Sequence, residues 1–199
     1  MADAKVALVS RFDTAMARID AVHAEDPEKD TGLPKELAYA QRMSAWLEKL
    51  APGASEPLRL AVRCQHLRRW AIPRSDYPEG KVGYLRWRKE ESLAHASLAG
   101  EILRQAGYDA DTVKRVQSLV KKERIKHDPE AQTLEDVTCL VFLEHEFAAF
   151  ALKHDEAKLI DILRKSWAKM SPKGHEAALA LALRLPAPLR ALVEKALTK

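Results

Sequence analysis

The chain has 199 residues, of which 47% are hydrophobic and 31% are charged, and its formal net charge is +4. No apolar run approaches the ~20 residues that span a bilayer, and the first residues lack a signal-peptide pattern. We therefore expect a cytoplasmic globular protein without a membrane partner. Glycine is scarce while alanine and leucine abound, which favours helices over sheets.

The cysteines and the basic residues are distributed unevenly along the chain. Cys64 and Cys139 lie in apolar-periodic stretches at a spacing that is not a zinc pattern, so we interpret them as reduced core residues. Between Arg59 and Lys89 there are nine Arg or Lys residues and two acidic residues. Such a segment can steer an anionic partner, or it can simply be a solvated face.

Apolar residues at helical spacing predict a helix over residues 3–23, with Val6 and Val9 on its buried face. A second helix is predicted to end at Pro52-Gly53, and a third to run from Ser55 to about Trp70. Proline at positions 73 and 78 predicts an extended segment after the third helix.

Later helices are predicted over residues 83–106, from 109, over 130–153, over 155–170, from 171 and from 186. Serine or aspartate stands at several of these starts, where a side chain can cap a helix. These residues are Ser55, Asp109, Asp155 and Ser171. No alternating pattern indicates a strand. The predicted fold class is therefore all-α, a compact single-domain helical bundle over residues 1–199.

The stretch Leu60–Pro78, LAVRCQHLRRWAIPRSDYP, is the strongest candidate for a site because His, Arg, Trp and Tyr are concentrated in it. On a helix, the spacing of His66 and Arg69 places them on one face. Arginine forks suit bidentate phosphate recognition, and aromatic rings can stack a base or can belong to the core. We predict ligand binding by a set of five residues. They are Arg69, Trp70, Arg74, Tyr77 and Arg88.

Part of the chain resembles the HD-domain phosphohydrolases. The stretch His95–Glu144 resembles their second half, with His95 as the helix-leading histidine. The family's His-Asp pair falls on Gln65-His66, its early His near Tyr39, its later His near Glu123, and its closing Asp near Thr138, two residues from Asp136. The resemblance implies an HD-like fold and a divalent metal as cofactor. The residues it leaves as metal ligands are His66, His95, Glu123 and Asp136.

The whole chain resembles the family called domain of unknown function 4202. The resemblance is carried by Arg18-Ile19-Asp20, Glu25-Asp26-Pro27, QRMSAWL, QHLRRWAIPRSDYP, GYLRWR, LEDVTCLVFLE, LIDILRKSW and KMSPKGHEAAL. It implies a single domain and no established reaction. The Lys-Met-Ser run at 169–171 is interpreted as a helix start, with Ser171 as cap and Pro172 in the first turn.

These observations lead to one functional expectation and two alternatives. We expect an HD-like protein that binds a small phosphorylated, nucleotide-like ligand. If it is an enzyme, the reaction is metal-assisted phosphoester hydrolysis with His66 as the catalytic acid or base. One alternative is an RNA- or tRNA-binding module that uses the basic, aromatic segment. The other is a non-catalytic HD-fold domain that binds a protein.

Overall fold

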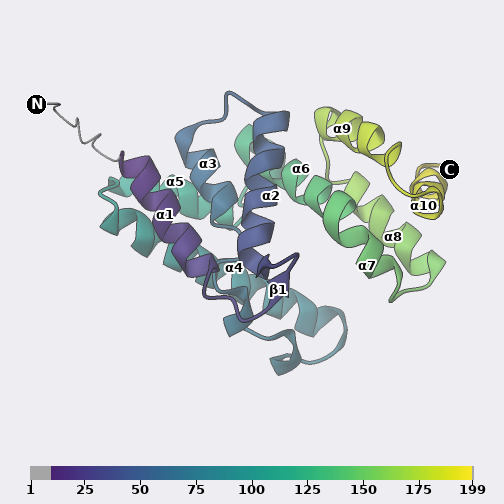
Figure 1. The fold of residues 1–199 in the computed structure, drawn as a ribbon, viewed down its shortest axis with the longest axis horizontal. Helices are drawn as coiled ribbons and strands as arrows, with labels where there is room; N and C mark the ends of the chain where they lie inside the picture. The colour runs from purple at the N-terminus through teal and green to yellow at the C-terminus, as the bar shows by residue number, and fades with distance from the viewer. Residues whose placement is uncertain (1–9, 199) are drawn as a thin grey trace, which may run out of the picture. The chain divides into compact units, whose positions relative to one another are not determined.

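The computed structural model describes residues 10–198, and nearly all regular structure in this range is helical (Figure 1). The α-helices are α1 (Arg11–His23), α2 (Lys35–Leu50), α3 (Glu56–Arg63), α4 (Gly80–Gln105), α5 (Ala110–Val120), α6 (Pro129–Val141), α7 (Phe147–Ala151), α8 (Glu156–Trp167), α9 (Pro172–Ala182) and α10 (Ala187–Leu197). Shorter turns are η1 (Arg69–Ala71), η2 (Arg74–Asp76), η3 (Ile125–His127) and the π-helical η4 (Phe142–Glu146). The predominantly helical class is thus confirmed. Val6 and Val9 of the first predicted helix lie outside the described residues.

The prediction that the chain contains no strand is wrong for one short hairpin. Strand β1 (Lys29–Asp30) pairs antiparallel with β2 (Leu33–Pro34). Thr31 and Gly32 join the strands with φ angles of 51° and 87°, the left-handed pair typical of a tight hairpin turn. Two-residue strands are too short to show an alternating pattern, so hydrophobic periodicity could not reveal them.

The described residues group into two compact units, each with its own core. The first unit comprises residues 10–40 and 55–121, and the second comprises residues 41–54 and 122–198. Helix α2 begins in the first unit and continues into the second. A single domain over the whole chain stays a prediction.

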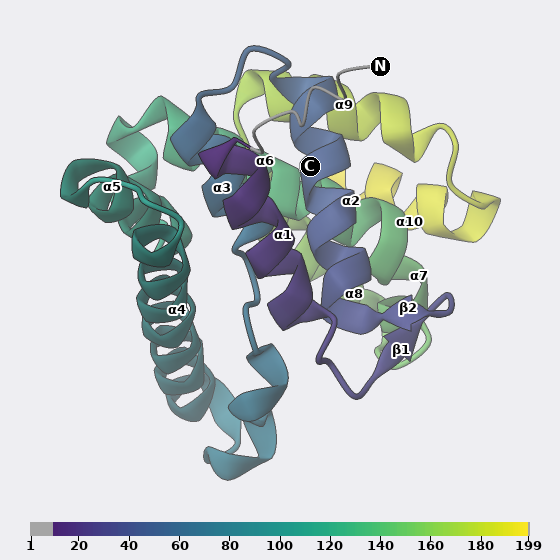
Figure 2. The ribbon, with the colours of Figure 1, turned by 60° about the vertical axis from the view of Figure 1, so that its left-hand side comes forward.

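Helices α1, α3, α4 and α5 build the first unit. Helix α4 is the longest of them, and α5 packs beside its C-terminal half as an antiparallel neighbour (Figure 2). Gly107 makes the turn between the two helices with a φ of 86°, and the Tyr108 N–H donates back to the carbonyl of Leu103, a common helix ending. The core side chains include Ile19, Leu60, Leu103, Val116 and Leu119.

Helix α3 ends at Arg63 and not near Trp70 as predicted. Its start is as expected, because the Ser55 side chain accepts the Leu58 N–H. The early end has a backbone cause: His66 and Arg68 have φ angles of 65° and 51°, which a right-handed helix does not allow. The residues of the predicted extended segment form the two turns η1 and η2.

Helices α6–α10 and the end of α2 build the second unit. The helix predicted over residues 130–153 is α6, η4 and α7 in succession. The π-helical turn inserts one residue into the helical repeat, so Leu140, Leu143 and Phe147 stay buried on both sides of it. As predicted, Asp155 caps α8 and Ser171 caps α9. Across residues 10–198, no helix is long and apolar enough to cross a membrane.

Candidate functional site

The turn between α3 and η1 presents His66 beside the Arg69 side chain. Nη1 of Arg69 lies 2.7 Å from Nε2 of His66 and 3.1 Å from its Nδ1. The sequence predicts this pair as neighbours on a helix face, but the left-handed turn at His66 and Arg68 brings them together. Left-handed non-glycine residues cost about 1–3 kcal/mol each. The fold therefore holds this turn against a local strain.

His66 is held on two further sides by residues of α2. Its Nδ1 lies 3.0 Å from Oε2 of Glu36. The Tyr39 ring stacks on the imidazole, with ring centroids 4.1 Å apart and planes 9° apart. The His66 ring is thus fixed by a carboxylate, a guanidinium and an aromatic face.

Glu36 occupies the first turn of α2, where a second carboxylate fixes the backbone. Oδ2 of Asp26 accepts the Glu36 N–H at 2.9 Å, and Oδ1 of Asp26 accepts the Glu28 N–H at 2.9 Å. Asp26 and Glu36 are both buried. Asp26 therefore supports the helix start that places Glu36 against His66.

Arg69 bridges His66 to α4. Its Nε lies 3.5 Å from Oε1 of Glu91, and its guanidinium carbon lies 5.1 Å from the centre of the Trp87 ring. The Trp87 ring is itself fixed, because its Nε1–H donates to the carbonyl of Ile72. The distance to Glu91 is too long for a good hydrogen bond, so the guanidinium keeps capacity for another acceptor.

Three buried polar atoms in the first unit have no hydrogen-bond partner within residues 10–198. They are Nδ1 of His23, Oε1 of Glu91 and Nε2 of His95. The other ring nitrogen of His23 lies 3.0 Å from the Arg63 carbonyl oxygen. The His95 and His66 rings lie 6.0 Å apart. We use the name buried polar cluster for six side chains, four of which are buried while His66 and Arg69 are half-buried. They are His23, Glu36, His66, Arg69, Glu91 and His95.

Burial and nearby charge keep two histidines of this cluster neutral. Burial, followed by the positive charges of Arg69 and Arg88, lowers the pKa of His95 to about 3. Burial also lowers the pKa of His23 and raises the pKa of Glu91, with the arginines opposing the latter shift. Both imidazoles are therefore uncharged at neutral pH.

The remaining predicted ligand-binding residues lie in other settings. Arg74 donates to the carbonyls of Tyr77 and Pro78, and the Tyr77 hydroxyl donates to Glu90. Trp70 is half-buried and Arg88 is exposed. Of the five, Arg69 belongs to the buried polar cluster, and Arg88 acts on Glu91 and His95 through its charge.

The four predicted metal ligands are divided between the two units. His66 and His95 belong to the first unit, whereas Glu123 and Asp136 belong to the second. Across residues 10–198, no group of three or more His, Cys, Asp or Glu side chains is arranged to hold a metal ion. Both nitrogens of His66 already have protein partners. Metal ligation stays a prediction that this geometry does not support.

Asp136 has a structural role in the start of α9. Its carboxylate accepts the N–H and the hydroxyl of Ser171, together with the Gln132 amide. A side chain at Gly174 would place Cβ 2.7 Å from the Asp136 carboxyl carbon. The Lys-Met-Ser run therefore forms the start of α9, where Ser171 donates to the buried Asp136 carboxylate. Ser171 caps this helix, as predicted.

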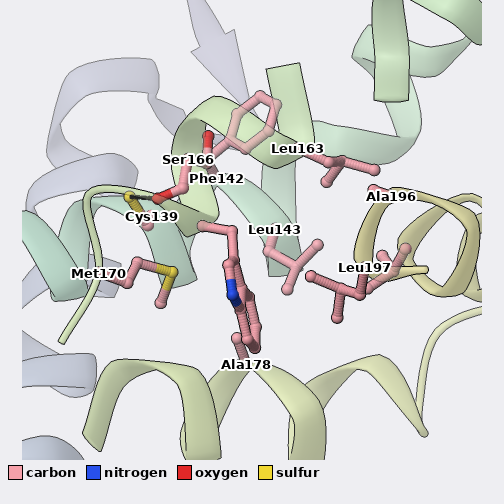
Figure 3. Close-up of a pocket in the computed structure, with 11 residues that line it drawn as sticks. Cys139, Phe142, Leu143, Leu163, Ser166, Met170, Ala178, Ala196 and Leu197 are labelled. Atoms are coloured by element: carbon pink, nitrogen blue, oxygen red, sulfur yellow. Dashed lines mark hydrogen bonds between the residues drawn. The ribbon is translucent and has the colours of Figure 1, made fainter. Parts of the chain in front are cut away.

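The second unit also contains a small apolar pocket (Figure 3). Side chains from α6, η4, α8, α9 and α10 surround it, among them Cys139, Leu143, Trp167 and Met170. The Cys139 thiol lies 3.9 Å from the Ser166 carbonyl oxygen. The pocket volume is about 30 Å³, whereas small-molecule sites typically have ~300–1,000 Å³. A nucleotide does not fit it.

Sequence reasoning missed Glu36, Glu91 and the part that His23 plays. Glu91 and His95 carry a signal, because they continue the spacing of Trp87 along α4 and all three are buried. Polar residues inside a buried helical stripe are uncommon unless they are paired or functional. Glu36 gives no comparable signal, since its position depends on the hairpin and on Asp26.

The fold and the cluster describe a helical protein with histidine, carboxylate and arginine side chains gathered in its first unit. A family model described as Domain of unknown function (DUF4202) matches residues 13–193, so the chain belongs to this family. No curated protein and no solved structure matches the chain.

Proposed function

We propose that the buried polar cluster binds a small phosphorylated, nucleotide-like molecule. The observation that carries the proposal is the set of three buried atoms without a hydrogen-bond partner, one of which, Oε1 of Glu91, lies 3.5 Å from Nε of Arg69. An unsatisfied buried polar group costs about 1–3 kcal/mol, and a cluster of such groups indicates a partner that the protein itself does not provide.

The chemistry of the cluster favours a phosphate group as that partner. Arg69 supplies a fork of N–H donors, and Arg88 adds positive charge nearby. Burial raises the pKa of Glu91, in the direction that weakens its repulsion of a phosphate. Arg63 is not an equivalent candidate, because Asp20 already pairs with its Nε and Nη2 at 2.6 and 2.7 Å.

Calorimetric titration with inorganic pyrophosphate and with nucleoside mono-, di- and triphosphates tests the proposal. We expect saturable binding that Arg69→Ala weakens by about 10-fold or more, the loss typical of a charge-assisted hydrogen bond. The matched control is Arg86→Ala, since Arg86 is exposed on α4 and pairs only with Glu90 among the described residues. Absence of saturable binding, or equal losses in both variants, would overturn the proposal.

Nucleic-acid binding is the second candidate, and the exposed start of α4 favours it. Tyr84 is 47% exposed and Val82 and Leu85 lie open beside it, with Lys81 and Lys89 exposed on the same helix. Exposed rings among cations suit single-stranded RNA. Affinity for a short RNA should fall steeply with salt and with Tyr84→Ala. RNA binding that neither salt nor Tyr84→Ala weakens would exclude nucleic-acid binding at the start of α4.

A further inference from the structure

Glu36, His66 and Arg69 form a continuous chain of polar contacts. Oε2 of Glu36 lies 3.0 Å from Nδ1 of His66, and Nε2 of His66 lies 2.7 Å from Nη1 of Arg69. The Glu36 carboxylate can only accept hydrogen bonds, and the Arg69 guanidinium can only donate them.

The contact with Glu36 selects one tautomer of the His66 imidazole. Nδ1 carries the hydrogen that it donates to the Glu36 carboxylate, so in the neutral ring Nε2 is the unprotonated nitrogen. Nη1 of Arg69 lies 2.7 Å from Nε2 and 3.1 Å from Nδ1, which places it over the ring beside Nε2. In an imidazole, a carboxylate on one nitrogen orients the ring and leaves the other nitrogen as a proton acceptor, as in triad-type sites.

We propose that Glu36 is the positioning residue of His66, and that Arg69 covers the proton-accepting Nε2 until an anionic ligand draws the guanidinium away. This inference rests on the proposed function for the ligand that moves Arg69. It adds a second role to Arg69, which both recognises the phosphate and uncovers the base.

The contacts that hold Arg69 are weak enough to exchange. The Arg69 side chain is 28% exposed, and its Glu91 neighbour lies at 3.5 Å. A cation over an aromatic ring contributes about 0.5–2 kcal/mol, less than the charge-assisted pair that a phosphate offers in two parallel bonds. An incoming phosphate therefore offers the Arg69 guanidinium stronger contacts than those it has without ligand.

His66 cannot follow Arg69 in that movement. Tyr39 stacks on its ring and Glu36 holds its Nδ1. Once uncovered, Nε2 takes a proton from a water or hydroxyl at the ligand, which leaves a hydroxide or alkoxide oxygen beside the imidazolium. The resulting imidazolium then lies against the Glu36 carboxylate, which stabilises its charge.

Nitrogen NMR of the full-length ¹⁵N-labelled protein tests both parts, because it distinguishes the protonated ring nitrogen from the unprotonated one. Without ligand, we expect the Nδ1–H tautomer of His66 in the wild type and in Arg69→Ala. Adding Glu36→Ala to Arg69→Ala should abolish this preference. The matched control is Glu28→Ala added to Arg69→Ala, since Glu28 is an exposed carboxylate just before β1 that pairs with Lys35, the neighbour of Glu36. Glu36→Gln replaces Glu36→Ala if the latter does not fold.

Pyrophosphate is then titrated into the wild type, with Arg69→Ala as the reference for an uncovered Nε2. We expect the Nε2 resonance to move toward its position in Arg69→Ala. An Nε2–H tautomer in Arg69→Ala would overturn the role of Glu36. Arg69-dependent binding with an unmoved Nε2 resonance would overturn the covering role while leaving the proposed function in place. Absence of any saturable change would overturn the proposed function and the covering role together, leaving the tautomer result to decide on Glu36.

Discussion

Gly83 allows the chain to pass close to the start of α4. A Cβ at this position would overlap the carbonyl oxygen of Pro78, the same oxygen that accepts from Arg74. Alanine normally favours a helix by about 1 kcal/mol over glycine. Overpacking against backbone costs about 1–3 kcal/mol. The clash therefore outweighs the helix preference of alanine at this position.

Gly83→Ala should therefore lower the free energy of unfolding by about 1–2 kcal/mol, measured by urea denaturation. Gly53 is the matched control, since a Cβ there meets nothing within 4 Å and its φ is not in the left-handed region. Gly53→Ala should be neutral or stabilising by up to about 1 kcal/mol. Equal effects at the two positions would contradict this explanation.

Both cysteines should resist thiol reagents in the folded protein. Burial raises the pKa of the Cys139 thiol to about 12 and raises that of Cys64 further. A thiol below its pKa stays protonated, and the thiolate is the reactive form. At pH 8 we expect slow labelling by a disulfide reagent and rapid labelling of two thiols in urea. Fast labelling of the folded protein would show that the thiols are accessible.

At the residue scale, sequence reasoning identified side chains by chemistry but not by partner. His66 and Arg69 were predicted from the concentration of His, Arg, Trp and Tyr in Leu60–Pro78, and His95 from the resemblance to the HD-domain phosphohydrolases. Glu36 was not, since its contact with His66 joins residues 30 positions apart. Arg74 stays a predicted phosphate contact, and its guanidinium donates to the backbone carbonyls of Tyr77 and Pro78.

At the element scale, the start of α9 depends on Asp136. Its carboxylate accepts two hydrogen bonds from Ser171 inside the second unit. Asp136→Ala should lower the free energy of unfolding by about 1–3 kcal/mol, because a buried donor loses its acceptor. The loss should be the same with and without a chelator. A loss that appears only in chelator-free, metal-loaded protein would support the predicted metal role instead.

Helix starts were predictable because their signals are local. Ser55, Asp109, Asp155 and Ser171 each accept an N–H of the following turn, which a single residue type suffices to indicate. The end of α3 was not predictable, because the left-handed backbone at His66 has no glycine to mark it, whereas Gly107 marks the end of α4. The π-helical η4 was hidden because apolar residues flank it on both sides.

At the scale of the whole molecule, composition and helical periodicity together predicted the helical class. Scarce glycine, abundant alanine and leucine, and helical periodicity all agree with one another, and such agreement specifies a fold class strongly. The division into two compact units has no compositional mark, because α2 passes through the boundary without a linker. The buried polar cluster in the first unit makes the stability of the protein depend on pH.

Protonation of buried histidines should destabilise the protein below neutral pH. The pKa of His95 is lowered to about 3 in the folded protein from 6.5. Between these values the unfolded chain binds a proton that the folded protein does not, so the free energy of unfolding falls as the pH falls. At pH 5 the loss amounts to about 2 kcal/mol. His23 acts in the same direction, because burial lowers its pKa as well.

Glu91 acts in the opposite direction, because burial raises its pKa above 4.5 in the folded protein. Its contribution to the free energy of unfolding is therefore lost as the pH rises from 4.5 through the folded pKa. Urea denaturation at pH 7.5 and pH 5 separates the two contributions when wild type is compared with His95→Gln. The variant should lose less stability than the wild type between these values, while the exposed control His127→Gln should follow the wild type. If His95→Gln keeps the full pH dependence, a charged His95 is tolerated in the fold. The cluster would then be more open to water than its burial indicates, because only hydration or a partner can stabilise that charge beside Arg69.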